Sequence, residues 1–130
     1  FIETMDMSYS YKPVLLKAIY EYMDSSGRVA LPDVVDYFID FYEDRKAHGM
    51  IAEKPNSIYQ KGEYTRKDVE KNVLSNPFKP FEDMRFLMRC KDVETIEVNS
   101  IIFRKLTKED WLHIIRVCDK SLEKYYARIS

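Results

Sequence analysis

The sequence contains few of the residues from which catalytic and cofactor sites are commonly built. It has three glycines and two histidines among 130 residues, and none of the HExxH, GxSxG or glycine-rich phosphate-binding motifs occurs in it. His48 and His113 belong to different predicted helices, so they are not spaced as paired metal ligands are. We therefore expect a segment without catalytic activity of its own, which binds no metal and no cofactor.

Cysteines and long apolar runs are also scarce. Cys90 and Cys118 form no CxxC pair, and isolated cysteines are typical of a reducing compartment, where they pack as small apolar side chains. No apolar run approaches the roughly 20 residues of a membrane-spanning helix, and the first residues are acidic where a signal peptide is basic. These features predict a cytoplasmic location and no membrane partner. Because the first residue is Phe1, we expect a segment of a longer protein.

An excess of positive charge is absent as well. The 21 basic and 22 acidic residues give a net charge of −1 and a pI of 6.2, whereas a domain that wraps duplex DNA is usually basic. Any nucleic-acid contact must therefore come from a local patch. The chain is 45% hydrophobic, which is typical of a globular protein. Its ten tyrosines suit the edge of a core or an interface.

The hydrophobic periodicity predicts a mainly helical chain. We expect a tail or linker at residues 1–10 and a single domain at residues 11–130. The loop at residues 49–63 is longer than the three- or four-residue turn of a plain helix-turn-helix, so it is either an insertion or a wrong assignment. The predicted helices begin near Pro13, Pro32, Thr65 and Thr107, and the last of them covers about residues 107–129. Thr65 with Asp68, and Thr107 with Asp110, have the spacing of a capping box, with Asp in place of Glu.

A hairpin is predicted between the third helix and the last one. Residues 86–90 and 95–98 alternate with a period of two, as in strands that have one buried face. Residues 28–31 could add a short first strand, and residues 101–103 a third. Together the segments predict an α+β fold that is mainly α with a small β-hairpin: a winged helix-turn-helix core plus a long C-terminal helix.

Basic residues concentrate between Gln60 and Lys91, a segment that contains eight basic and five acidic residues. A third helix lying in a major groove would present its polar side to bases and phosphates, while the hairpin tip would contact phosphates. The alternative is that these are ordinary solvated charges, and Asp68 and Glu70 on the same helix favour it. The candidate DNA-binding residues are Arg66, Lys67, Lys71 and Asn72 on the helix, and Arg89 and Lys91 on the hairpin.

The last helix carries an apolar seam with a period of 3.5 residues, which is typical of packed helices. It lies either across the core of its own domain or against a second copy or another domain. The acidic second helix has no Lys or Arg between residues 31 and 44, so it would repel DNA or face a basic partner. Protein–protein interaction or homodimerisation is therefore the alternative function. The candidate interface residues are Trp111, Ile115, Leu122, Tyr125 and Tyr126.

The run SYKPVLLKA at residues 10–18, followed by GRVAL at residues 27–31 and an amphipathic helix, resembles a module of bacterial DNA-processing proteins. Similar segments occur beside HNH nuclease domains in restriction proteins and as accessory domains of superfamily 2 DEAD/DEAH-type helicases. Residues 76–77, Phe81 and LTKED at residues 106–110 are compatible with the helicase-linked type. The resemblance implies a non-catalytic domain that binds or positions double-stranded DNA within a larger parent chain. It transfers no catalytic residue, because the helicase motifs and the HNH histidines are absent.

Overall fold

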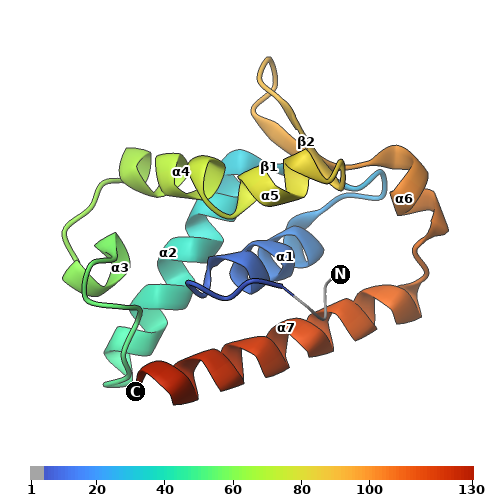
Figure 1. The fold of residues 1–130 in the computed structure, drawn as a ribbon. Helices are drawn as coiled ribbons and strands as arrows, with labels where there is room; N and C mark the ends of the chain where they lie inside the picture. Colours follow the sequence, from blue (N-terminus) through green and yellow to red (C-terminus); the bar gives the residue numbers. More distant parts are fainter. Residues whose placement is uncertain (1–4) are drawn as a thin grey trace.

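The structure is a computed structural model that describes residues 5–130, and helices dominate it (Figure 1). The mainly helical α+β class predicted from the sequence is confirmed. The helices are α1 (Tyr11–Tyr22), α2 (Leu31–Ala47), α3 (Ile58–Lys61), α4 (Arg66–Ser75), α5 (Phe78–Asp83), α6 (Ser100–Lys105) and α7 (Lys108–Ile129), and the strands are β1 (Arg28–Ala30), β2 (Leu87–Cys90) and β3 (Thr95–Val98).

The strands form one antiparallel sheet in the order β1-β3-β2. Ile96 of β3 pairs with Val29 of β1 on one side and with Arg89 of β2 on the other. The predicted hairpin and the predicted short first strand are therefore both confirmed. Leu87, Ile96 and Val98 are buried on one face of the sheet, which fixes the register because a slip of one residue would expose them.

Two local predictions are corrected. Residues 101–103, expected as a possible strand, form part of α6, because the Asn99 side chain accepts a hydrogen bond from the N–H of Ile101 at 2.9 Å and caps a helix there. The loop at residues 49–63 contains α3, which is capped by the Ser57 side chain. Helix α5, which is not among the predicted helices, contains the buried Phe78 and Phe81.

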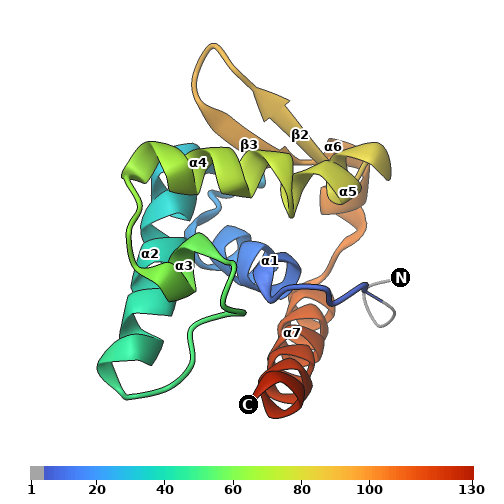
Figure 2. The same cartoon turned by 60° about the vertical axis from the view of Figure 1, so that its left-hand side comes forward.

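Helix α1 is the centre of the core, because α2 and α7 pack on it from different sides (Figure 2). Val14, Leu15, Leu16, Ala18 and Ile19 are all fully buried. Burial on several sides explains why the apolar residues of α1 cover more than the narrow stripe of a surface helix. Helix α4 packs on α2 through Val69 and Val73, and α7 contributes Trp111, Ile114, Cys118, Leu122, Tyr125 and Tyr126.

Among the helices of residues 5–130, not one combines the length and the apolar character that crossing a membrane requires.

The turn between α1 and β1 depends on Gly27, and its replacement by alanine should lower the free energy of unfolding by roughly 2–3 kcal/mol. Gly27 has φ of +82°, and an added Cβ would lie 2.7 Å from Cδ1 of the Phe103 ring on α6. Gly49 is the matched control, because its φ is +72° but an added Cβ would meet nothing within 4 Å. Gly49→Ala should therefore show the backbone cost alone, about 1 kcal/mol. Urea unfolding of both variants measures the difference, and equal losses would contradict the packing of α6 on this turn.

Candidate nucleic-acid interface

Helix α4 is positioned by its first turn and by its buried face. The Thr65 hydroxyl accepts a hydrogen bond from the Asp68 N–H at 3.2 Å, and the Asp68 carboxylate accepts one from the Thr65 N–H at 2.9 Å. This is the capping box that the sequence predicts, and it fixes the start of the helix. Because Val69 and Val73 point into the core, the side chains of Lys67 and Lys71 are exposed on the outside of α4.

The outside of α4 and the β2–β3 hairpin together form a shallow groove with a volume of about 510 Å³. Figure 2 shows the hairpin projecting beyond α4 on this side of the molecule. Three of the predicted DNA-binding residues, Lys67, Lys71 and Arg89, share the groove although they come from different elements. Acidic side chains are interleaved with them, so the groove is mixed in charge. Its lining consists of Thr65, Lys67, Asp68, Glu70, Lys71, Leu74, Arg89 and Glu94.

Two predicted DNA-binding residues are directed away from this groove. The Arg66 guanidinium forms an ion pair with Asp36 on α2 and donates to the Pro32 carbonyl at 3.4 Å. The Asn72 Oδ1 atom accepts a hydrogen bond from the Tyr59 hydroxyl at 2.8 Å, and Asn72 lines a different hollow, next to α3. A helical projection of the sequence predicts that both side chains lie on the DNA-facing side of the helix, and the structure places neither of them there.

The two predicted DNA-binding residues of the hairpin, Arg89 and Lys91, differ in solvent exposure and in ion pairing. Arg89 is largely covered, with 24% of its side chain exposed, and its Nη2 atom lies 3.7 Å from a carboxylate oxygen of Glu94. Lys91 is exposed at the tip of the hairpin. Of the six predicted DNA-binding residues, Lys67, Lys71 and Lys91 are therefore the exposed cations that form none of the ion pairs within residues 5–130.

The predicted interface residues of the last helix mostly lie inside the domain. Trp111, Leu122, Tyr125 and Tyr126 are buried, and Ile115 is half-buried. Helix α7 therefore lies across the core of its own domain, which is the first of the two alternatives. Four of these five side chains are therefore covered by the domain itself and are not part of its exposed surface.

The structure also contains a buried polar cluster that the sequence does not indicate. The Glu53 carboxylate is fully buried and accepts hydrogen bonds from the Ser10 N–H at 2.9 Å, the Ser10 hydroxyl and the Tyr125 hydroxyl. Because Ser10 Oγ donates to Glu53, the Tyr42 hydroxyl at 2.6 Å donates to Ser10. We call Glu53, Ser10, Tyr42 and Tyr125 the Glu53 cluster.

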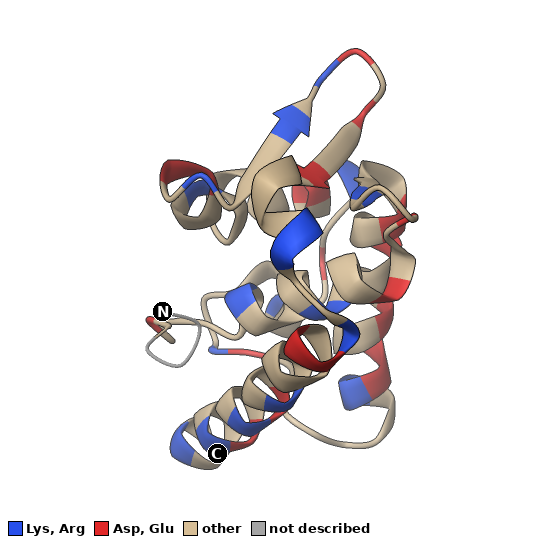
Figure 3. Ribbon diagram, turned by 90° about the vertical axis from the view of Figure 1, so that its right-hand side faces the viewer, with Lys and Arg blue, Asp and Glu red and all other residues tan. Residues whose placement is uncertain are grey.

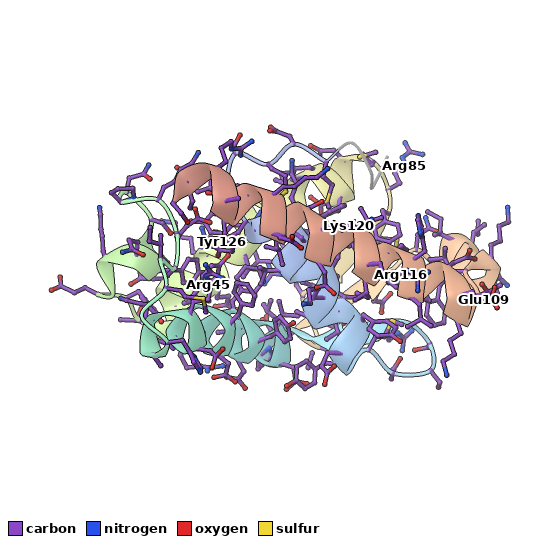
Figure 4. The ribbon with its side chains drawn as sticks, turned by 90° about the horizontal axis from the view of Figure 1, so that it is seen from below. Arg45, Arg85, Glu109, Arg116, Lys120 and Tyr126 are labelled. Carbon is purple, nitrogen blue, oxygen red and sulfur yellow. The ribbon has the colours of Figure 1, made fainter. Side chains whose placement is uncertain are left out.

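Burial keeps the tyrosines around this cluster protonated. It raises the pKa of Tyr126 to about 12 and that of Tyr42 well above its ordinary value. Tyr126 donates to the Ala52 carbonyl at 2.7 Å and stacks under the Arg45 guanidinium, which lies 3.3 Å from its ring centre (Figure 4). The arrangement is enclosed and fully hydrogen-bonded, which indicates a structural role.

Two observations concern metal binding and the buried cysteine. Within residues 5–130, no three His, Cys, Asp or Glu side chains converge closely enough to hold a metal ion. The Cys118 thiol is buried, and its pKa is raised to about 12 by that burial, so it is not a thiolate at neutral pH.

Comparison with known proteins gives no relative: neither family models nor curated proteins nor solved structures match this chain. The resemblance to domains of helicases and restriction proteins therefore stays a prediction.

Proposed function

We propose that this chain is a winged-helix domain that binds double-stranded DNA through α4 and the β2–β3 hairpin. In this role it acts as a non-catalytic accessory module of a larger bacterial helicase or restriction-type protein. The order of elements supports the proposal: a helix, a short strand and four further helices, of which α3 and α5 are short, precede a hairpin, and the sheet order is β1-β3-β2. In a helix-turn-helix the recognition helix lies in the major groove; α4 would take that role, and the short α5 lies between it and the hairpin.

The observation that carries the proposal is the groove that unites Lys67 and Lys71 of α4 with Arg89 of the hairpin. An α-helix with its side chains is about 10–12 Å wide and fits a major groove about 12 Å wide. Helix α4 is ten residues long, so it spans about 15 Å. With α4 in the groove, the hairpin beside it would carry Arg89 and Lys91 toward the phosphate backbone.

The chemistry of the side chains favours weak sequence preference. Asn72 and Arg66 are the residue types that read base edges bidentately, but both are occupied by Tyr59 and Asp36. The remaining cations are mostly lysines, which bind phosphates as point charges. The domain would therefore position duplex DNA for its parent protein and would not select a target site.

Amide chemical-shift mapping with a short duplex of mixed sequence tests the proposal. We expect the largest shifts at Lys67, Lys71 and Lys91, and no change along α7, which is remote from the groove. The same titration with a single strand of equal length is the control and should give smaller shifts. Shifts confined to α7, or no shifts at all, would contradict the proposal.

A further inference from the structure

The outward side of α2 is rich in acidic residues. Its exposed or half-exposed acids recur every three or four residues, and no Lys or Arg occurs on α2 before Arg45. Arg45 and Lys46 turn away from this side, because Arg45 donates to the Ile51 carbonyl and Lys46 to the Tyr59 carbonyl. We call this set the α2 acidic row; it consists of Asp33, Asp36, Asp40, Glu43 and Asp44.

Aromatic side chains border the α2 acidic row. Tyr37 and Phe41 are half-buried and line a shallow hollow of about 590 Å³ together with Asp40 and Asp44. Tyr22 of α1 is 45% exposed, and its ring meets that of Tyr37 edge-on at 6.3 Å. Aromatic faces beside carboxylates suit the long stems and charged heads of Lys and Arg, through packing and cation–π contacts. The surface is therefore shaped for a basic, amphipathic occupant.

A surface of that chemistry exists on the same chain, along the outside of α7. Arg116, Lys120, Lys124 and Arg128 are exposed and follow one another every four residues, which places them on one side of the helix. Figure 4 shows Arg116 and Lys120 on the outer side of α7. We call these four residues the α7 basic row. Glu123 is the acid nearest to it on the helix surface, while the nearby Asp119 pairs with Lys17 at 2.6 Å.

The two rows match in length as well as in charge. At about 1.5 Å per residue, the α7 basic row is about 18 Å long and the α2 acidic row about 17 Å. Within residues 5–130, Arg116, Lys120, Lys124 and Asp40 form no ion pair. Other members are engaged within the molecule: Asp36 pairs with Arg66, Asp44 lies 3.5 Å from His48, Glu43 accepts from the Tyr64 hydroxyl, and Arg128 donates to the Met7 carbonyl at 2.7 Å. Asp40, Arg116, Lys120 and Lys124 therefore remain available to a partner.

The two rows cannot meet within one molecule. Helix α1 lies between α2 and α7 and packs against both. Figure 3 shows the acids of α2 along one edge of the molecule and the cations of α7 along a different one. We propose that the α2 acidic row of one molecule binds the α7 basic row of a second copy. Because the two rows lie along different edges of the molecule, a pair of molecules that joins one set of rows leaves the other set free, so the contact is heterologous and extends head to tail.

The contact should be weak and sensitive to salt, because it depends on exposed ion pairs. Sedimentation equilibrium should show an average mass that rises above the monomer mass of 15.6 kDa with protein concentration in about 10 mM salt. In about 1 M salt, where charges are screened beyond about 3 Å, the mass should return to that of the monomer. A wild-type protein that is monomeric in low salt at every concentration would overturn the proposal.

Two variants test the direction of the contact. Asp40→Asn/Asp44→Asn weakens the acidic surface and keeps the basic one, and Lys120→Glu/Lys124→Glu reverses the basic surface and keeps the acidic one. Each variant alone should be a monomer, but an equal mixture should form a discrete one-to-one heterodimer, because one complementary pair of surfaces survives. Circular dichroism confirms that both are folded. A mixture that stays monomeric, or a single variant that still associates, would overturn the proposal.

A third variant separates this contact from the proposed DNA binding. Lys67→Glu/Lys71→Glu changes the net charge as much as Lys120→Glu/Lys124→Glu but leaves both rows intact, so it should associate as the wild type does. Loss of association in this variant would assign the effect to net charge and overturn the proposal. A wild-type protein that is monomeric but binds a polylysine peptide would also overturn the proposal. In that case the α2 surface would accept a basic segment of another protein.

Discussion

Replacing Glu53 with alanine is expected to lower the free energy of unfolding by at least about 3 kcal/mol, because three buried hydrogen-bond donors would lose their acceptor. The carboxylate accepts hydrogen bonds from the Ser10 N–H, the Ser10 hydroxyl and the Tyr125 hydroxyl, all in the buried interior. Each unsatisfied buried group costs about 1–3 kcal/mol. A domain of this size is typically stable by about 5–15 kcal/mol, so the variant would be near its unfolding limit.

The loss should be large because the Glu53 cluster joins three segments that are distant in sequence. Ser10 immediately precedes α1, Glu53 lies in the connection between α2 and α3, and Tyr125 is in the last turns of α7. Lys54 strengthens the same junction, because its ammonium group donates to the Ser8 carbonyl at 2.5 Å. Without the carboxylate, the connection and the end of α7 lose their shared anchor.

Two further variants make this prediction specific, with urea unfolding as the measurement. Glu53→Gln keeps one acceptor oxygen but adds N–H donors among existing donors, so an intermediate loss is expected. Tyr125→Phe removes one hydroxyl and should cost about 1–2 kcal/mol. A Glu53→Ala variant as stable as the wild type within about 0.5 kcal/mol, the usual range for surface substitutions, would show that the cluster does not support the fold.

Reversing both groove lysines, as Lys67→Glu/Lys71→Glu, is expected to weaken duplex binding by two orders of magnitude or more. The change removes two phosphate contacts and introduces two charges that repel phosphates. The loss should be large because electrostatic attraction supplies nearly all of the affinity in non-specific DNA binding. Both side chains are exposed on α4, so the free energy of unfolding should change by little. Fluorescence anisotropy with a labelled duplex measures the affinity.

The matched control is Lys120→Glu/Lys124→Glu, which alters the net charge equally but lies on α7. It should retain the wild-type affinity at protein concentrations too low for self-association. Equal losses in the two double variants would show that the total charge of the protein governs binding and that the groove does not.

Arg66 provides an internal comparison. The sequence predicts that reversing Arg66 together with Lys67 abolishes DNA binding without unfolding the domain. Because Arg66 is paired with Asp36, we expect Arg66→Gln to reduce the affinity less than Lys67→Gln does. The opposite order would mean that Arg66 leaves Asp36 when DNA binds.

The sequence predicts local features well where the signal lies in neighbouring residues. Thr65 and Asp68 form the expected capping box, and so do Thr107 and Asp110. The alternating residues of β2 and β3 pair as expected, because a half-buried strand has a period of two. A strand at residues 101–103 is a wrong prediction, since a β-branched run favours strand while the single capping side chain of Asn99 starts a helix.

The candidate site is predicted less well because its outcome depends on contacts between distant residues. A helical projection shows that Asn72 and Arg66 are polar, but it cannot show that Tyr59 reaches one and Asp36 the other. Glu53 is a single acid in a loop, and only the fold brings Ser10 and Tyr125 to it.

The buried face of α7 also depends on contacts that the sequence of the helix does not show. Its spacing in the sequence predicts a period of 3.5, whereas burial of Ile114 in place of Ile115 fits an ordinary helix packed on α1. Which of two adjacent isoleucines faces inward depends on the neighbouring helix, and the sequence of α7 alone does not contain that information.

The dependence of duplex affinity on salt tests the proposed function most directly. If Lys67, Lys71, Arg89 and Lys91 each neutralise one phosphate, the logarithm of the association constant should fall against the logarithm of salt concentration with a slope of about −3.6, at about −0.9 per phosphate. The slope should become about −1.8 when Lys67 and Lys71 are replaced by glutamine. A wild-type slope near zero, or a slope that this replacement leaves unchanged, would contradict the assignment of the groove as the DNA-binding surface.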